Sequence, residues 1–310
     1  MNMLILNENM KIYKRKRTWV MIAFVVLFVL LQIVNLKASG NTFSKDWRAQ
    51  LEQENTHYKQ EAAKTDALKI EIKQAEKNIL LNQYYLDKGI APTTNAWNFA
   101  VNQVSNLIVA VSLISIIIAG EIVAAEFVSG TIKLLLTRSV SRTKIYFSKY
   151  MTAILFGLFL LLVGILLSIL LGGLLFGFGG LGDSYLYVKN NTVGEASMIQ
   201  ALLGGYLFNI PYMLLTITLA FMISAAFRST TFSIVISLLI SVAGFVIAIA
   251  MNGWSWTKYF VFSHTDFTPF VFGNPSIEGI TFGFSIILVA IHLMVMHLIS
   301  YPLFVNRDVT

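Results

Sequence analysis

Six long apolar runs limit what this chain can fold into, because each is close to the about 20 residues that cross a membrane core as a helix. The runs occupy residues 18–36, 101–123, 150–178, 198–227, 231–250 and 279–300. The sequence therefore predicts an all-α membrane protein with six transmembrane helices. An even number of crossings places both termini on the same side of the membrane.

The composition supports this class and excludes others. Hydrophobic residues make up 56% of the chain and charged residues 13%, with a mean hydropathy of +0.70. A soluble domain carries about 25% charged residues, so soluble, disordered and nucleic-acid-binding proteins are poor matches. The chain has no cysteine, which excludes disulfides, thiolate catalysis and cysteine metal sites.

The first apolar run follows a basic cluster at residues 14–17, an arrangement that membrane anchors share with secretory signal peptides. The apolar core of a signal peptide spans about 7–15 residues, and this run is longer. Residues 36–40 match a cleavage site only loosely. We therefore expect a retained helix at 18–36 after a basic N-terminal piece at 1–17, with a cleaved signal peptide as the alternative.

The basic residues predict the orientation. With the N-terminus inside, the inner pieces hold 12 of the 23 basic residues, and the two short outer loops hold only Lys189 and Lys258. Lys and Arg favour the cytosolic side, which predicts that both termini are cytosolic. The inner pieces are then residues 1–17, about 124–149, 228–230 and 301–310.

Residues 37–100 form the long extracellular segment of this arrangement. Its stretch 45–88 has no Gly or Pro and is rich in helix-forming residues with a weak heptad pattern. Because both ends of the segment return to the membrane, we expect a bent helical hairpin or a helix along the surface. It could be a solvated spacer or a surface that binds a partner or substrate.

Two features mark the last five spans, residues 101–310. The outer loop 251–278 is rich in aromatic residues, which indicates an interfacial anchor or a re-entrant element. The fourth span contains Asn209 and Pro211, and Pro removes a backbone donor from a helix. This pair indicates either a packing kink or a hinge.

Catalytic motifs are nearly absent. The chain has neither a Walker motif nor an H-E-x-x-H zinc motif, so we expect no enzyme activity, no metal and no cofactor. His292 and His297 are five residues apart, which is poor spacing for a metal pair on a helix. The spans also contain few ionisable groups, Glu121 being the nearest candidate, which disfavours an ion-coupled carrier.

The inner segment 121–150, which includes the cytosolic piece 124–149, has the highest density of polar residues with a possible role. Glu121 and Glu126 precede a break at residues 130–131, and apolar and basic residues follow. This pattern predicts a short amphipathic helix at the cytosolic face of the membrane. Anchoring to lipid headgroups would explain the basic residues, but it explains the acids and the break less well.

The same segment resembles the signature of ABC-2 type ABC transporter permeases, many of which carry E-x-x-x-G-T-x-x-x-L-L-x-x-P-x-S-R and then a Lys. Ser139 stands where Pro is frequent in the family. The matching residues are Glu126, Gly130, Thr131, Lys133, Leu135, Leu136, Arg138, Ser139, Val140, Ser141, Arg142 and Lys149. The six spans and the long first outer loop also fit this family.

The resemblance implies a membrane subunit without ATPase activity that works with a separate cytosolic ATP-binding cassette protein. It also implies two permease subunits per transporter, identical or related, and a coupling helix between spans two and three. We expect Leu134, Leu135, Leu136 and Arg138 to dock into a cassette groove. Glu126 and Arg142 would form polar contacts that orient this helix, next to the break at Gly130 and Thr131.

The sequence thus predicts the permease subunit of an exporter in a bacterial plasma membrane. Its cargo would be amphipathic or hydrophobic, such as an antimicrobial peptide, a lipid or a drug, because the spans offer apolar walls with few charges. Two alternatives stay open. One is an ion-coupled carrier or channel that acts alone, and the other is a non-transporting membrane sensor whose outer helical segment binds a ligand.

Overall fold

The computed structural model describes residues 1–38, 46–64, 69–131, 140–227, 229–251, 254–277 and 279–306. Within these ranges, six helical segments are long and apolar enough to cross a membrane, which confirms the predicted class. They are Lys16–Ala38 (α2), Val104–Val128 (α6, Val104–Glu121, with α7, Ala124–Val128), Arg142–Phe176 (α9), Met198–Ala226 (α10), Thr230–Ala250 (α11) and Phe282–Val305 (α13). The chain is accordingly a multi-pass membrane protein.

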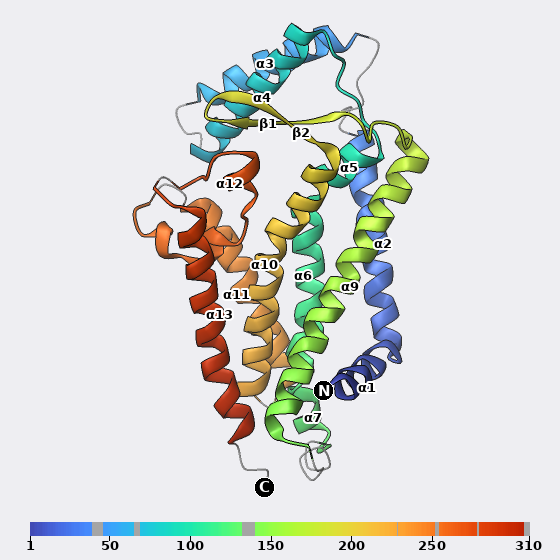
Figure 1. The fold of residues 1–310 in the computed structure, drawn as a ribbon, viewed down its shortest axis with the longest axis vertical. Coiled ribbons are helices and arrows are strands. Elements are labelled where there is room, and N and C mark those ends of the chain that lie inside the picture. The colour runs from blue at the N-terminus through green and yellow to red at the C-terminus, as the bar shows by residue number, and fades with distance from the viewer. Residues whose placement is uncertain are drawn as a thin grey trace.

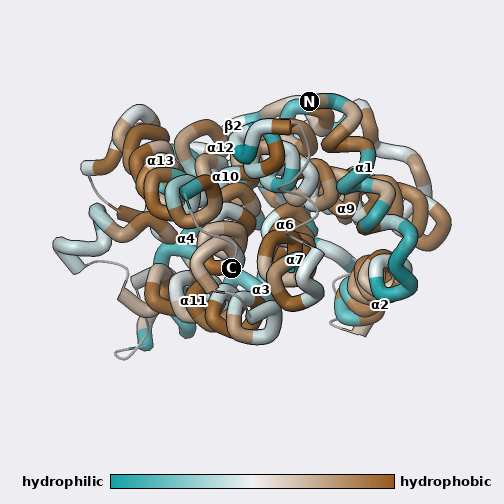
Figure 2. The backbone as a smooth tube through the Cα atoms, turned by 90° about the horizontal axis from the view of Figure 1, so that it is seen from below, coloured by the Kyte–Doolittle hydropathy of each residue, from teal (hydrophilic) through white to brown (hydrophobic). Residues whose placement is uncertain are grey.

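The six helices form one elongated bundle with α6 at its centre (Figure 1). Figure 2, the view along the bundle, shows α6 enclosed by α9, α10 and α11. Small or short side chains of α6, such as Ser112 and Ser115, are fully buried there. Of the six segments, Val104–Val128 is therefore the one that the rest of the bundle covers best.

The N-terminus and the end of α13 lie at the same end of the bundle, as an even number of spans requires (Figure 1). We call this the terminal end and the opposite one the distal end. A short helix, Asn2–Tyr13 (α1), packs against α9 at the terminal end. The sequence predicted only a basic segment at 1–17, so α1 is an addition. The third span begins at Arg142, eight residues before the predicted start, because the Ser141 side chain caps the helix.

The distal end carries the long segment after α2 as two helices, Trp47–Ala62 (α3) and Lys69–Lys88 (α4), which pack on each other. This is the helical hairpin that was one of the two predicted forms. The predicted stretch 45–88 is thus interrupted after Ala62. Leu51 and Ala75 are buried between the two helices, so the weak heptad pattern serves this pairing. A short helix, Ala96–Asn102 (α5), capped by Asn95, then leads into α6.

The distal end also holds a β-hairpin, so the prediction of an all-α fold needs correcting to a mainly helical one. Strands Ser184–Lys189 (β1) and Thr192–Ser197 (β2) are antiparallel, with Lys189 opposite Thr192. Asn190 and Asn191 form the two-residue turn, with φ of 51° and 58°. Both angles are left-handed, a conformation that Asn tolerates better than most residues and that this turn type requires.

The aromatic loop 251–278 folds onto the distal ends of α10, α11 and α13. It contains two 3-10 turns, Thr257–Tyr259 (η1) and Val261–His264 (η2), and a short helix, Thr268–Phe272 (α12). His264 is buried, and its ring nitrogens bond the Ser285 hydroxyl at 2.8 Å and the Lys258 carbonyl at 2.9 Å. These bonds tie the loop to α13.

Candidate functional site

A buried cluster of charges joins α1, α7 and α9 at the terminal end. At its centre is Lys149 of α9, whose side chain is fully buried. Its ammonium group lies 2.9 Å from Glu8 Oε2 and 2.8 Å from Glu126 Oε1, and it donates to the Ile122 carbonyl at 3.1 Å. A buried ammonium group is stable only when it is paired in this way.

A second lysine completes the cluster from the solvent side. Lys11 Nζ lies 2.6 Å from Glu8 Oε1 and 3.1 Å from Glu126 Oε1. Glu8 and Lys11 are three residues apart in α1, so they share one face of that helix. Each of the two carboxylates therefore contacts both lysines.

The cluster shifts the proton affinity of Glu8. Burial raises the pKa of this carboxyl, but the ammonium groups of Lys149 and Lys11 outweigh burial and hold the pKa below its usual value. The charged form of Glu8 is thus the one that the fold stabilises.

The link between α1 and α2 carries further polar contacts. Glu121, at the end of α6, pairs with Arg15 at 3.4 Å and with Arg17. The hydroxyl of Thr18 donates to the Ile12 carbonyl at 2.6 Å. Glu121 is therefore an ion-pair partner of the N-terminal segment at the bundle end.

The structure brings only some of the predicted coupling residues into this cluster. Glu126 is part of it, and Gly130 follows with a left-handed φ of 71°, which confirms the predicted break. Thr131 shares a 2.8 Å hydrogen bond with Ser129. Arg142 donates instead to the Val305 carbonyl at the end of α13, at 2.8 Å. Leu134, Leu135, Leu136 and Arg138 lie outside the described residues.

The sequence analysis missed the N-terminal residues that pair with the acids and with Lys149. Glu8 and Lys11 belong to the cluster, and Arg15 and Arg17 pair with Glu121. One signal was available: Glu8 is the single acid in the first 17 residues. Lys149 also lies beside a long apolar run, where an unpaired charge would be costly. Those two observations together would have suggested a pair, although not its geometry.

The predicted hinge residues lie in the distal half of α10, which continues as one helix through Pro211. The Asn209 amide donates to the Gly205 carbonyl at 3.0 Å and to the Thr268 hydroxyl at 3.4 Å. Asn209 therefore connects α10 to the aromatic loop as well as to its own helix. Its role as a hinge stays a prediction.

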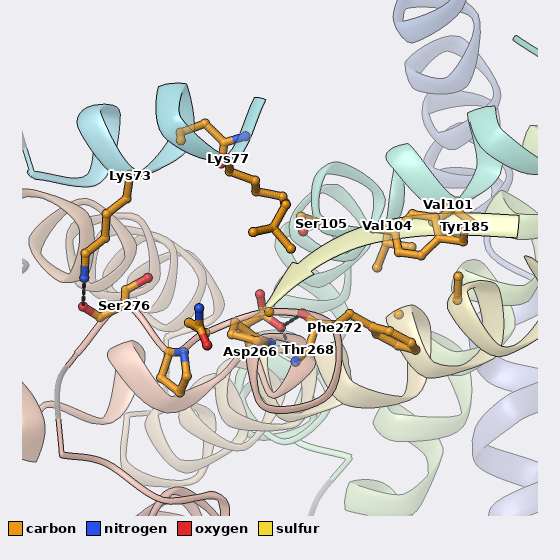
Figure 3. Close-up of a pocket in the computed structure, with 18 of the residues that line it drawn as sticks. Lys73, Lys77, Val101, Val104, Ser105, Tyr185, Asp266, Thr268, Phe272 and Ser276 are labelled. Carbon is orange, nitrogen blue, oxygen red and sulfur yellow. Dashed lines mark hydrogen bonds between the residues drawn. The ribbon is translucent and has the colours of Figure 1, made fainter. Parts of the chain in front are cut away.

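A large pocket lies at the distal end (Figure 3), and Asn209 is one of its lining residues. Its volume is about 760 Å³, and α4, β1, α10 and the loop before α13 supply its walls. Lys73 of α4 donates to the Ser276 carbonyl at 3.4 Å and so bridges the pocket from one side. Asp266 also lines the pocket, and it accepts hydrogen bonds from the backbone N–H of Thr268, at 2.8 Å, and from the Thr268 hydroxyl.

Comparison with known proteins places the chain among bacterial relatives. A Bacillus subtilis (strain 168) protein named "Uncharacterized protein YhcI" is 36% identical over 313 residues, covering 99% of this chain and 98% of the relative. "Uncharacterized membrane protein YdbK" of the same organism is 29% identical over 200 residues, covering 63% of this chain and 76% of the relative. No solved structure matches the chain.

The family model described as "Protein of unknown function (DUF2705)" matches residues 69–310, which include α4, all spans from α6 onward and the distal hairpin. This match covers well over half of the chain and contains both Glu126 and Lys149. The chain therefore belongs to the DUF2705 family.

Proposed function

We propose that this chain is the permease subunit of an ATP-binding cassette exporter. It works with a second permease subunit and a separate cytosolic ATPase, and it moves an amphipathic or hydrophobic peptide, lipid or drug across a bacterial plasma membrane. The observation that carries the proposal is the buried contact of Lys149 with Glu126. These are two residues of the motif on which the resemblance to ABC-2 permeases rests.

The contact gives the proposal a physical basis for coupling. Separating Lys149 from its carboxylates would leave a buried charge unpaired, at a cost of about 3–5 kcal/mol. A push on the segment around Glu126 is therefore transmitted to α9 rather than absorbed locally. With 35 residues at about 1.5 Å each, α9 carries such a movement from the terminal end to the distal end.

The proposal is tested by purifying the chain from its own membrane, identifying by mass spectrometry a cassette ATPase that co-purifies with it, and reconstituting both in liposomes. We expect Glu126→Gln and Arg142→Ala to retain the assembled complex while ATP hydrolysis no longer drives export. Glu52→Gln, which changes an exposed acid of α3 at the distal end, is the matched control. Wild-type coupling in both terminal-end variants would show that the coupling assignment is wrong.

The same preparation separates the two rival functions. A carrier or channel that acts alone would transport without any cassette protein present. A sensor would lose its function on deletion of residues 45–88, and the terminal-end variants would have little effect. Export that requires the cassette and fails in Glu126→Gln supports the permease over both.

A further inference from the structure

Two neighbouring pockets at the distal end share part of their walls. The larger one, about 760 Å³, lies under α4, and a smaller one, about 200 Å³, lies between α6, α10, α11 and the aromatic loop. Ser105, Asn209 and Asp266 line both of them. The combined volume is within the range of about 300–1,000 Å³ that small-molecule sites occupy.

Asp266 is a carboxylate without an ion-pair partner in the part of the chain that the structure describes. Its hydrogen bonds come from neutral groups, the N–H and hydroxyl of Thr268 and the side chain of Asn209. Its neighbours thus orient the carboxylate and leave its charge unneutralised. Lys73 is held on the α4 side of the pocket by its bond to Ser276 (Figure 3).

Asp266 is an exposed residue that lines both pockets. Desolvation by nearby protein atoms raises the pKa of the Asp266 carboxyl, and the hydrogen bonds from Thr268 and Asn209 offset this only in part. A cation beside the carboxylate would favour its charged form. The ammonium group of a ligand that enters the pockets can therefore reach this carboxylate.

The smaller pocket indicates what else a ligand must carry. Tyr212, Phe245 and Phe262 line it, and the Tyr212 ring stands edge-on to the rings of Phe245 and Phe262 at 6.2 and 6.5 Å. Ile108 and Ile249 complete an apolar wall. Such a chamber suits an alkyl or aromatic group of a ligand. A charged group would find no partner in it except Asp266 at its edge.

We propose that the two pockets form one binding site for an amphipathic molecule with a primary ammonium group. The ammonium group binds Asp266 at the junction, and the apolar part enters the chamber of Tyr212, Phe245 and Phe262. The polar remainder occupies the larger pocket under α4. As an assignment of cargo this inference rests on the proposed function, whereas the binding itself needs no cassette partner.

The site is tested on the full-length chain in phosphatidylcholine nanodiscs, without any ATPase. The probe is a dodecylamine that carries a photoactivatable diazirine, and labelled residues are mapped by mass spectrometry. We expect saturable labelling of residues that line the two pockets. Unlabelled dodecylamine should compete, whereas dodecanol and dodecanoate, with the same chain but no ammonium group, should not.

Asp266→Asn should weaken the apparent affinity about ten- to hundred-fold, the range for loss of a hydrogen bond to a charged group. Asp87→Asn, at an exposed acid of α4 that bonds Gln83, should leave it unchanged. Equal competition by dodecanol, or labelling spread over the lipid-facing helices, would overturn the proposal. The competition experiment uses the wild-type chain, so its result does not depend on whether a variant folds. Labelling of the pockets together with transport that needs no cassette protein would refute the permease function and leave the binding site intact.

Discussion

Lys149 and its two carboxylates form a network. The loss of unfolding free energy caused by replacing one glutamate depends on whether the other still pairs with Lys149. The double variant Glu8→Gln and Glu126→Gln leaves the fully buried ammonium group without an anion among the described residues. We expect it to lose about 3–5 kcal/mol of unfolding free energy. Each single variant keeps one carboxylate on Lys149 and should lose less than half of that.

The measurement is unfolding of the purified chain in mixed micelles by a denaturing detergent, followed by circular dichroism. Glu52→Gln again serves as the control. A double variant no less stable than the single ones would show that the contacts do not stabilise the terminal end.

Glu8 also predicts how this end responds to acid. Its pKa is lowered in the fold, so its contribution to stability is present above the usual glutamate pKa and is lost as the pH falls through the lowered value. Below that range we expect α1 to detach, because a neutral Glu8 leaves Lys11 and Lys149 with only Glu126 between them.

Hydrogen exchange of the α1 amides, corrected for the intrinsic effect of pH, measures this detachment. Protection should fall in a step below the usual glutamate range in the wild type. Glu8→Gln should show weaker protection without that step, and a step of equal size in both proteins would point to another group.

At the scale of elements, the β-hairpin depends on its two left-handed asparagines. Asn191→Gly should be tolerated, whereas Asn191→Val should destabilise the turn by about 1–2 kcal/mol, because a β-branched residue strains this conformation. Since Tyr185 and Val188 of β1 line the larger pocket, the valine variant should also reduce labelling by the amine probe. Unchanged labelling in the valine variant would show that the hairpin does not shape the site.

Local patterns predicted those elements whose causes are local. The break at Gly130 follows from a residue type that favours a left-handed φ, whereas the third span was predicted to begin eight residues after the true start of α9 at Arg142. The β-hairpin was missed although its Asn-Asn pair is a recognisable turn signal between alternating residues. The end of α3 could not be predicted, since no Gly or Pro marks it and the pairing with α4 decides it.

The ion-pair and hydrogen-bond partners of the charged residues could not be predicted from the sequence. Glu126 was expected to orient a coupling helix together with Arg142, and the structure places them in different contacts, with Lys149 and with the Val305 carbonyl. Such pairings depend on how helices far apart in sequence meet. The apolar runs predict that each helix buries one face, but they do not predict which helix packs against that face.

At the scale of the whole molecule, the orientation of the bundle is the next prediction. The chain has no cysteine, so single cysteines can report the side of each end. Ser129→Cys lies exposed at the terminal end and Thr192→Cys exposed at the distal end. In intact cells, a membrane-impermeant maleimide should label Thr192→Cys and leave Ser129→Cys unlabelled, with the reverse in inside-out vesicles. The opposite result would invert the predicted topology and remove the basis for a cytosolic motor.

The Glu8–Lys149 pair joins residues 141 positions apart, and this separation has a consequence for biosynthesis. A ribosome adds about 5–20 residues per second, so roughly 7 to 28 seconds pass between translation of the acid and of its buried partner. During that interval the first helix has no lysine from α9 to dock on. Its outward side chains Met3, Leu6 and Met10 suit a temporary place on lipid headgroups. The N-terminal helix is thus made first but can take its final place only after α9 has been made.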